Sequence, residues 1–515
     1  MTLNPDLHLT QLNDQFEIDW LKRWALYSPN KPALTCGDTG RSLNYEQFFR
    51  QACIGADFLK RQYHIQKGDR VLLMSTNEIY TFVLFFALSR LGATLVPINY
   101  RLTESEVKYL IDDSQPTLIV YEQQYLETLK KISSGRPLLS LVGDAGFEQA
   151  CLRGSFEECE AKNYFYSVNH SSALIIYTSG TTGFPKGAMI SHQALFWNSI
   201  NTSLRLNITE SDAAVIFLPL FHTGGWNVLS TPFFHRGAHI ILNKKFEADQ
   251  ILNLSEKFKC TLLFGVPTTM SMMSVSQRFQ SVNLSHVRYA IVGGEPMPIP
   301  EIEKWHSKKI PIRQGYGLTE FGPNVFSLNE SDSIRKMGSI GFPNFYVEVS
   351  VRDDQNRICV ADEVGELWLK GPMAMTGYWN KPEATESTFH EGWLKTGDLV
   401  RFDSENYFYV VGRKKEMYKS GGENVYPAEI EKVLAQYPGV REAAVIGVKD
   451  PQWGEVGHAF ISLNEGVSYS ETDLREYLVK NLAKFKNPKF VTVLKELPKG
   501  DSGKILKRKL IDPHS

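Results

Sequence analysis

The chain has 515 residues, a formal net charge of -1, 43% hydrophobic residues and 22% charged residues. This length exceeds one ordinary domain, so we expect two or more domains with sizeable cores. The near-neutral charge argues against nucleic-acid binding and against broad adsorption to a membrane surface. Six scattered cysteines without a Cys-x-x-Cys pair indicate reduced thiols rather than a disulfide framework or a zinc site.

The N-terminus and the most apolar stretch argue against export and membrane insertion. Residues 1–6 lack a basic region followed by an apolar core, so no signal peptide is predicted. Residues 82–98 are interrupted by Arg90, Gly92 and Pro97 and are short for a membrane span. We therefore expect a cytoplasmic enzyme without a transmembrane segment. The sequence does not decide the oligomeric state, and a homodimer stays open.

Strand and helix patterns alternate from residue 45 onward. Helical spacing over 45–63, 80–91 and 104–111 alternates with strand-like runs over 71–74, 93–98 and 117–121. Thr103 is suited to cap the third helix. This rhythm predicts parallel α/β units.

A glycine-rich stretch follows a predicted buried strand at 173–177. It reads Thr178-Ser179-Gly180-Thr181-Thr182-Gly183-Phe184-Pro185-Lys186-Gly187. Glycines let backbone N–H groups approach a ligand, and the hydroxyls and the lysine add donors, which suits a polyphosphate. The spacing differs from the P-loop of the ATPases because a glycine follows the lysine. On composition alone, a flexible surface loop fits equally well.

Three more glycine-rich turns end later strands of the same alternating region. A helix is predicted over 192–204, and a strand over 215–218 leads to Phe221-His222-Thr223-Gly224-Gly225-Trp226. Further strands over 239–242, 261–264 and 287–292, with a helix near 248–257, lead to Gly293-Gly294-Glu295 and then to Gly315-Tyr316-Gly317-Leu318-Thr319-Glu320. Ligands in open α/β sheets bind beyond the carboxyl ends of strands, so these turns predict one shared site.

The texture changes from about residue 333. Short strands over 346–351, 365–370 and 407–411 predict a β subdomain, and the polar residues 412–416 predict a linker. Helices over 427–435 and 471–482 with strands over 443–448, 459–463 and 490–494 predict a compact α+β domain. The expected fold is α/β, with an N-terminal domain (1–412), a hinge (413–416) and a small C-terminal domain (417–515).

Several motifs in a fixed order resemble those of the adenylate-forming superfamily, which includes acyl-CoA synthetases, firefly-luciferase-like enzymes and peptide-synthetase adenylation domains. They are the stretch 177–187, Tyr316-Gly317-Leu318-Thr319-Glu320, Thr396-Gly397-Asp398, Gly412-Arg413-Lys414-Lys415-Glu416, Gly421-Gly422-Glu423-Asn424-Val425-Tyr426-Pro427 and Ser502-Gly503-Lys504-Ile505. The resemblance implies that a carboxylate attacks the α-phosphorus of ATP to form an acyl adenylate, and that a thiol then displaces AMP. Such an attack of one anion on another needs cations and donors placed where charge develops.

The resemblance also implies roles for individual residues. Thr178, Ser179, Gly180, Thr181, Thr182, Gly183 and Lys186 would hold the phosphates, with Thr178 and Glu320 orienting Mg²⁺. Asp398 and Arg413 would bind the ribose and phosphate, and the adenine site would include Gly293, Gly294, Glu295, Gly315, Tyr316, Gly317, Leu318 and Thr319. Lys504 and Glu320 would be catalytic. Lys415 would be the hinge of a mobile C-terminal domain that presents first Lys504 and then Gly421 and Gly422 on the CoA side.

The acid pocket is expected around 221–226. His222 resembles a residue that positions the carboxylate, and Trp226 resembles a gate tryptophan, although ordinary core packing explains Trp226 equally well. The neighbouring positions lack an Asp that would pair with a substrate ammonium, which favours an acid without an amino group. Asp501-Ser502 resembles a carrier-protein site, but the chain ends too soon after it to form a carrier bundle, so free coenzyme A is the expected acceptor.

The leading hypothesis is an ATP-dependent acyl-CoA synthetase for a fatty or other hydrophobic acid. An arylacid or succinylbenzoate-type CoA ligase, and an acyl-AMP ligase that loads a separate carrier protein, stay as alternatives. A catalytically silent nucleotide-binding protein is a third, which the joint presence of Lys504, Asp398, Arg413 and Glu320 disfavours. Gly500 and Tyr418 depart from the family pattern without removing a group that the chemistry needs.

Overall fold

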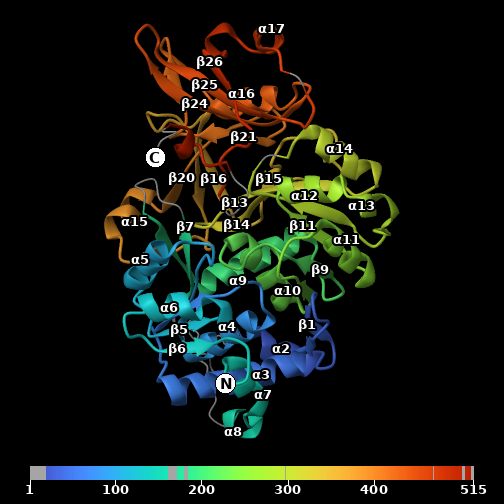
Figure 1. Ribbon diagram of the computed structural model, residues 1–515, viewed down its shortest axis with the longest axis vertical. Helices are drawn as coiled ribbons and strands as arrows, with labels where there is room; N and C mark the ends of the chain where they lie inside the picture. Colours follow the sequence, from blue (N-terminus) through green and yellow to red (C-terminus); the bar gives the residue numbers. More distant parts are fainter. Residues whose placement is uncertain are drawn as a thin grey trace, which may run out of the picture.

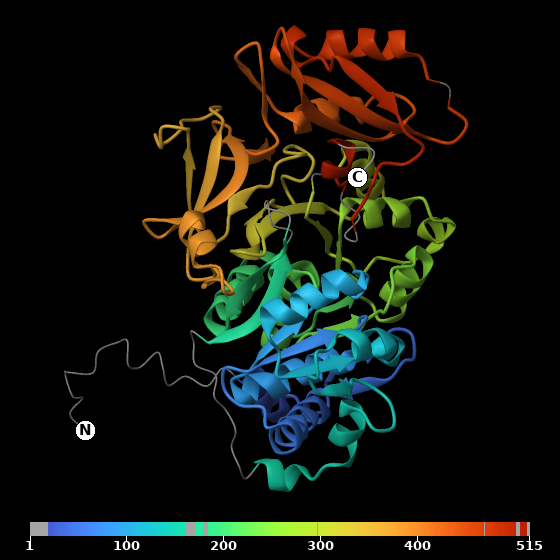
Figure 2. The same ribbon diagram turned by 60° about the vertical axis from the view of Figure 1, so that its left-hand side comes forward.

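The computed structural model describes residues 19–160, 171–178, 184–295, 297–467, 469–500 and 505–511. Figures 1 and 2 show a large body built from the first part of the chain, a β-rich part beside it, and a C-terminal part at the top of the view. This arrangement agrees with the predicted α/β fold with a β subdomain and a small α+β C-terminal part.

A seven-stranded sheet carries the chain into and out of the glycine-rich stretch. Its strands are β3 (Arg70–Met74), β4 (Thr94–Pro97), β5 (Leu118–Tyr121), β6 (Leu138–Ser140), β7 (Ser172–Thr178), β8 (Lys186–Ser191) and β18 (Gly377–Tyr378), in the order β18-β8-β7-β4-β3-β5-β6. The strands β3 to β7 pair in parallel, as predicted. In contrast, β8 is antiparallel to both β7 and β18.

Two further sheets complete the large body. One contains β1 (Pro32–Cys36), β2 (Ser42–Asn44), β9 (Ala213–Ile216) and β10 (His239–Leu242). The other contains β11 (Leu262–Gly265), β12 (Tyr289–Val292), β13 (Ile312–Leu318), β14 (Gly322–Ser327) and β15 (Phe342–Pro343), in that order. Since β11, β12 and β13 are parallel, their carboxyl ends meet at one edge, where the predicted turns lie.

Helices cover these sheets close to the predicted positions. The main ones are α3 (Tyr45–Tyr63), α4 (Ile79–Leu91), α5 (Glu104–Ser114), α9 (His192–Leu206) and α11 (Ala248–Lys257). Thr103 caps α5 by accepting a hydrogen bond from the backbone N–H of Glu106, as predicted. All residues of α4 are buried, which explains its apolar sequence on every side.

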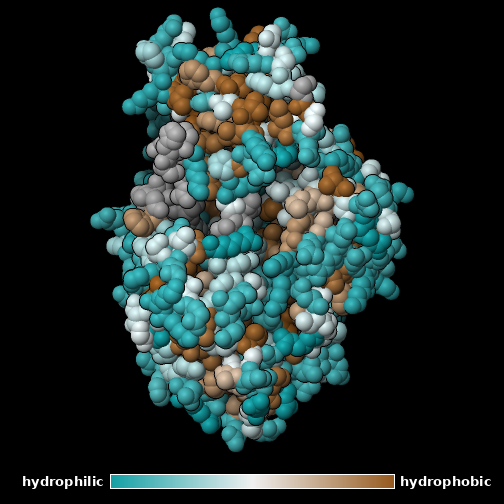
Figure 3. Space-filling model, viewed as in Figure 1, coloured by the Kyte–Doolittle hydropathy of each residue, from teal (hydrophilic) through white to brown (hydrophobic). Residues whose placement is uncertain are grey.

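The β-rich part and the C-terminal part each have their own sheet. The first contains β16 (Glu348–Arg352), β17 (Gly365–Lys370), β19 (Phe389–His390), β20 (Trp393–Phe402) and β21 (Phe408–Arg413). The second contains β22 (Tyr418–Ser420), β23 (Glu423–Val425), β24 (Val440–Asp450), β25 (Gly454–Leu463) and β26 (Phe490–Val493), with α16 (Pro427–Leu434) and α17 (Glu471–Asn481). In Figure 3, hydrophobic side chains gather over the region of β24 and β25.

Short elements connect or flank the sheets. They are α2 (Trp20–Tyr27), η1 (Gln123–Tyr125), α6 (Leu126–Ile132), α7 (Phe147–Arg153), α8 (Phe156–Glu160), η2 (Gly224–Val228), α10 (Ser230–Arg236), α12 (Pro267–Ser274), α13 (Gln277–Ser281), α14 (Ile299–Ser307), α15 (Pro382–Thr388), η3 (Lys484–Lys486) and α18 (Arg508–Ile511). Of these, η2 is a π-helix, a form that is frequent at functional sites.

Three segments differ from the sequence-based predictions. Lys186 begins strand β8 instead of belonging to the loop before it. Residues 315–318 continue β13 as a strand and do not form a turn, because β14 folds back beside them and pairs with them. Gly412 and Arg413 still belong to β21, so the segment predicted as a linker is shorter at its start. The domain boundaries at 412 and 417 stay predictions.

Candidate active site

The end of β7 meets a residue that lies far along the chain. Thr178 Oγ1 donates a hydrogen bond of 3.3 Å to Glu320 Oε1, across 142 positions of sequence. Tyr378 donates a second bond of 2.9 Å to the same oxygen. Burial, followed by the charge of Glu320, raises the pKa of Tyr378 well above its usual value, so the phenol stays a donor. The two predicted Mg²⁺ ligands therefore lie together.

The chemistry of this pair fits a hard divalent cation. A carboxylate and a hydroxyl oxygen are the ligand types that Mg²⁺ accepts, and Mg²⁺ commonly completes its shell with water and substrate phosphates. Among the described residues no group of three or more His, Cys, Asp or Glu residues could hold a metal by itself. A cation here would therefore depend on the nucleotide for further ligands.

Lys186 approaches the same region from β8. Its Nζ lies 5.2 Å from the centre of the Tyr378 ring, at cation–π distance. Residues 179–183, which include the predicted phosphate-binding residues Ser179, Gly180, Thr181, Thr182 and Gly183, lie outside the described residues. The two strands that flank them are paired up to Thr178 and Lys186.

A second cluster joins β13 to the hairpin of β20 and β21. Asp398 and Arg413 are register partners, and Arg413 Nε lies 2.6 Å from Asp398 Oδ1. Tyr316 donates a hydrogen bond of 2.5 Å to the other carboxylate oxygen. Burial, and after it the charge of Asp398, raises the pKa of Tyr316 well above its usual value. Burial lowers the pKa of Arg413, but the negative groups around it, Asp398 foremost among them, together outweigh this effect and raise the pKa overall.

The predicted adenine-site glycines lie beside this cluster. Gly293 and Gly294 follow β12, and a Cβ placed on Gly293 would lie 3.5 Å from the backbone oxygen of Gly315 in β13. At Gly317 a Cβ would lie 2.2 Å from the Pro323 backbone, so only glycine fits there. Glu295 lies on the surface after this turn, and Leu318 and Thr319 are half-buried at the end of β13.

The predicted acid-pocket residues lie at and within η2. His222 accepts backbone hydrogen bonds from Gly225 and Trp226, and its ring contacts Phe221 at 4.5 Å. Trp226 has 0% exposed surface and packs against Phe82 and Phe85, with ring centres 5.1 Å apart in both cases. The indole N–H donates to the backbone oxygen of Leu220. The structure therefore places Trp226 in the aromatic core behind the predicted pocket.

A buried amide cluster lies between α9, η2 and β14. Asn198 donates a hydrogen bond of 2.7 Å to the backbone oxygen of Asn227. Asn324 donates to Thr202 at 2.7 Å and to the same backbone oxygen at 3.2 Å. Asn344 in turn donates to the backbone oxygen of Asn324 at 2.8 Å. These side chains are all buried, so the wall behind η2 is tied together by hydrogen bonds.

The segment after β21 leads to the C-terminal part. Lys415 is exposed in a turn in which the N–H groups of Glu416 and Met417 donate to the backbone oxygen of Arg413. Gly421 and Gly422 form the turn between β22 and β23, and both have positive φ, at 60° and 89°. The structure brings neither glycine into contact with the two clusters above.

Lys504 lies outside the described residues, but the chain on either side of it is described. Lys499 and Ile505 form an isolated antiparallel bridge. Lys507 Nζ lies 2.8 Å from both Glu416 and Glu431. The last described segment is therefore anchored beside the start of the C-terminal part.

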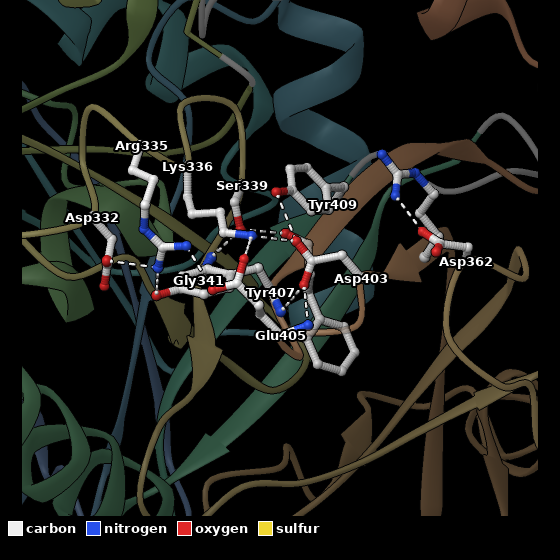
Figure 4. A network of polar contacts seen from close by, with 12 residues as sticks. Asp332, Arg335, Lys336, Ser339, Gly341, Asp362, Asp403, Glu405, Tyr407 and Tyr409 are labelled. Carbon is white, nitrogen blue, oxygen red and sulfur yellow. Dashed lines mark hydrogen bonds and ion pairs between the residues drawn. The ribbon is translucent and has the colours of Figure 1, made fainter.

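A polar network fixes the far end of the β20–β21 hairpin (Figure 4). Lys336 Nζ lies 2.8 Å from Asp403 and 2.5 Å from Glu405, and Arg335 lies 2.6 Å from Glu405. Tyr409 donates a hydrogen bond of 3.2 Å to Asp403. We call Arg335, Lys336, Asp403 and Glu405 the hairpin clamp. It ties the loop after β14 to the hairpin that carries Asp398 and Arg413.

Two residues near the predicted site were missed by sequence reasoning. Tyr378 lies in a short β-like piece with no glycine-rich or charged motif that would mark it. Trp453 is 50% exposed, and a Cβ on Gly421 would lie 3.0 Å from its indole ring. An exposed tryptophan next to a Gly-Gly turn was the available signal, but Gly421 and Trp453 lie thirty-two positions apart in the sequence and meet only in the fold.

Comparison with known proteins adds an independent line of evidence. Residues 21–379 match the family model of the AMP-binding enzymes, and residues 429–504 match that of the AMP-binding enzyme C-terminal domain. The chain is 35% identical over 491 residues to a feruloyl-CoA synthase from an Amycolatopsis species, covering 95% of this chain and 97% of the relative. It is 34% identical over 504 residues to the long-chain-fatty-acid–CoA ligase FadD13 of Mycobacterium tuberculosis, covering 97% and 98%.

A solved structure extends the likeness to three dimensions. The o-succinylbenzoate coenzyme A synthetase of Bacillus subtilis, in complex with ATP and a magnesium ion, has a TM-score of 0.85 and 30% identity, covering 96% of this chain and 99% of the other. No helix among the described residues is long and apolar enough to cross a bilayer. The chain belongs to the adenylate-forming superfamily of AMP-binding enzymes, in the branch of the AMP-forming acyl-CoA synthetases.

Proposed function

We propose that this protein joins a hydrophobic carboxylic acid to coenzyme A, using ATP and Mg²⁺, through an acyl adenylate. The observation that carries the proposal is the hydrogen bond between Thr178 and Glu320 at the start of the glycine-rich stretch. Together with the Tyr316, Asp398 and Arg413 cluster, this pair supplies groups for both ends of a nucleotide. The relatives and the solved neighbour with ATP and magnesium support the same reaction.

The phosphate end would be held by Thr178, Glu320, Lys186 and the stretch 179–183. Thr178 and Glu320 offer oxygen ligands, and Lys186 offers a cation to the leaving pyrophosphate. A bound Mg²⁺ would neutralise charge that builds up on the phosphates. The protein itself contributes the fixed positions of these groups, because their strands are paired on both sides of the stretch.

The nucleoside end would lie against Tyr316, Asp398 and Arg413. Tyr316 and Arg413 each bind one oxygen of the Asp398 carboxylate, so this carboxylate is held in one orientation for the ribose hydroxyls. The glycines at 293, 294, 315 and 317 let the backbone approach the adenine closely. Leu318, Thr319 and Glu295 would complete that wall.

The C-terminal part would supply the remaining groups. Lys504 would bridge the carboxylate and the α-phosphate during adenylation, and rotation at Lys415 would then bring Gly421 and Gly422 to the site for thioester formation. Trp453, which packs beside Gly421, would offer an aromatic face to the incoming thiol substrate. His222 would position the acid carboxylate between the two steps.

The acid is proposed to be compact, of aryl-acid size, rather than long-chain. A tunnel that extends past η2 would have to move Trp226 away from Phe82, Phe85 and Leu220. It would also have to break into the amide cluster of Asn198 and Asn324, whose buried donors are already bonded. The long-chain acid stays the second candidate because one relative, FadD13, is named for that substrate class.

A panel of carboxylic acids with ATP and CoA, read as AMP release, tests the proposal. We expect the highest kcat/KM with phenylpropenoic or arylacetic acids and lower values for straight chains of twelve carbons or more. Preference for the long chains would overturn the compact-acid proposal. Acid-dependent pyrophosphate exchange without CoA-dependent AMP release for any acid would instead favour an enzyme that loads a carrier protein.

Paired tryptophan variants test where the pocket ends. Trp226→Ala should raise the kcat/KM for a long-chain acid relative to an aryl acid by about ten-fold, because space opens behind η2. It should also lower the free energy of unfolding by about 3–5 kcal/mol. Trp305→Ala is the control, since Trp305 is equally buried but packs in a different cluster with Phe279. It should cost similar stability without changing the acid preference.

The cellular location is proposed to be the cytoplasm. All six cysteines are buried and none is in a disulfide, which fits a reducing compartment.

A further inference from the structure

Tyr378 touches two residues that the proposed function uses, although no sequence motif marks it. Its hydroxyl donates a hydrogen bond of 2.9 Å to Glu320 Oε1. The face of its ring lies 5.2 Å from Lys186 Nζ. One side chain therefore contacts both the proposed cation ligand and the proposed phosphate-binding cation.

The backbone around Tyr378 is held firmly in place. Tyr378 pairs with Ala188 and Gly377 with Met189, which adds strand β18 to the edge of β8. The N–H of Trp379 donates a bond of 2.8 Å to the Gly187 backbone oxygen, and Tyr378 N–H donates to Thr385 at 2.9 Å. Gly377 has a φ of 145°, and a Cβ there would lie 2.8 Å from Thr385, so a larger residue is excluded.

The hydrogen bonds on Glu320 leave one of its oxygens available. Thr178 and Tyr378 both donate to Oε1. Among the residues that the structure describes, no hydrogen bond or ion pair involves Oε2. Because Oε1 is fixed by these two bonds, the carboxylate presents Oε2 in a set direction. Outer-shell hydrogen bonds orient metal ligands in the same way.

We propose that Tyr378 is a positioning residue that aims Oε2 of Glu320 at the cation and holds Lys186 over the phosphates. This inference rests on the proposed function, because it assigns the cation to Glu320. It goes beyond that function by assigning the alignment of both charged groups to the short strand β18, which lies in the sequence between β17 and β19 but pairs with β8. The hydroxyl and the ring of Tyr378 have separate tasks, so they can be separated by substitution.

The hydroxyl is tested by Tyr378→Phe, which keeps the ring. The measurement is equilibrium binding of ATP at increasing Mg²⁺, together with binding of ATP without Mg²⁺ and binding of AMP. We expect the half-saturating Mg²⁺ concentration to rise about ten-fold or more, as for loss of other outer-shell partners. Binding of AMP and of Mg²⁺-free ATP should stay within two-fold of the wild type.

The ring is tested by Tyr378→Leu. Removal of the aromatic face should weaken Mg²⁺-free ATP binding as well, because Lys186 loses its cation–π contact, while AMP binding stays unchanged. Tyr109→Phe is the matched control, since its hydroxyl donates a bond of 3.1 Å to the Pro185 backbone oxygen beside the same stretch. It does not contact Glu320, so its Mg²⁺ dependence should equal that of the wild type.

Three outcomes would overturn the inference. An unchanged Mg²⁺ dependence in Tyr378→Phe would remove the role of the hydroxyl. An equal loss of all three kinds of binding, together with a lower melting temperature, would show that Tyr378 only supports the fold. A wild-type protein whose ATP binding ignores Mg²⁺ would instead refute the proposed function on which the inference rests.

Discussion

Arg413 and Asp398 lie directly opposite each other in neighbouring antiparallel strands, and their side chains form an ion pair of 2.6 Å. The carboxylate is buried, with 6% of its side chain exposed, whereas 47% of the arginine side chain is exposed. Arg413 and Tyr316 replace part of the water that Asp398 loses on burial. Asp398 is therefore held in place while Arg413 stays partly accessible to solvent, which suits the nucleotide-binding role proposed for the pair.

Replacement of the buried carboxylate should weaken nucleotide binding. Asp398→Asn removes the charge that both neighbours bind, and we expect AMP and ATP affinity to fall about ten- to a hundred-fold, the cost of one or two charge-assisted hydrogen bonds. The change is measured by titration with AMP. Asp362→Asn is the control, because Asp362 forms an exposed pair of 3.0 Å with Arg401. Equal losses in both variants would argue against a nucleotide role.

The lysine of the last motif should be needed for only one half-reaction. Lys504→Ala should lower acid-dependent pyrophosphate exchange by about 10²- to 10³-fold, since a cation at the developing charge is lost. Thioester formation from preformed acyl adenylate should stay within two-fold. Lys509→Ala, which changes an exposed lysine of the same segment, should leave both rates unchanged. An equal fall in the two half-reactions of Lys504→Ala would contradict the proposed division of work.

The hinge residue should be needed for the other half-reaction. Lys415→Pro fixes φ near -65°, which restricts backbone rotation at this exposed turn. We expect normal pyrophosphate exchange and a large loss of thioester formation. Lys415→Ala keeps a rotatable backbone and should retain both activities. Normal overall turnover in the proline variant would rule out a hinge at this position.

The hairpin clamp should make stability depend on pH in the acid range. Burial raises the pKa of Asp403, but the bonds from Lys336 and from backbone N–H groups outweigh it and lower the pKa below the usual 3.8. Bonds from Lys336 and Arg335 likewise lower the pKa of Glu405 below 4.5. A lowered carboxylate pKa stabilises the fold above the unfolded-state value, and this contribution is lost as the pH falls through the lower folded-state value.

Substitution of the clamp lysine measures this contribution. Lys336→Met should have a lower melting temperature than the wild type at pH 7, and the difference should shrink as the pH falls below about 4, where both carboxylates become protonated. The exposed pair of Lys108 and Asp112 offers the control Lys108→Met. A difference that stays constant from pH 7 to pH 3 would show that the clamp acts by packing rather than by charge.

The sequence predicted the parallel strands and their helices closely because their patterns are local. Residues 45–63 repeat apolar side chains at helical spacing, Asn44 caps them by accepting a hydrogen bond from the N–H of Gln47, and α3 has the predicted bounds. Strands of four apolar residues, such as β9, are buried on both faces and stand out in the sequence as short apolar runs. The predicted partners Thr178 with Glu320, and Asp398 with Arg413, also lie together, although their roles stay predictions.

The sequence could not predict features that depend on distant pairing. Strand β8 begins with Lys186 and Gly187 and ends with Ser191, which is not a typical strand sequence. It is extended because β7 and β18 pair with its two edges. Residues 315–318 look like a turn by composition, but β14 holds them extended. From the sequence, a gate role and ordinary core packing explained Trp226 equally well. Only its contacts with Phe82 and Phe85 show where the ring packs.

Lys507 joins two stretches of the C-terminal part that lie ninety-one positions apart, through its bond of 2.8 Å to Glu416. Glu416 directly follows Lys415, and Lys507 comes three residues after Lys504 in the chain. Under the proposed rotation at Lys415, this bond ties the segment that follows the hinge to the segment that follows Lys504. The last motif would therefore turn together with the C-terminal part. A longer or looser connection would let the C-terminal part turn while its terminal segment lagged behind.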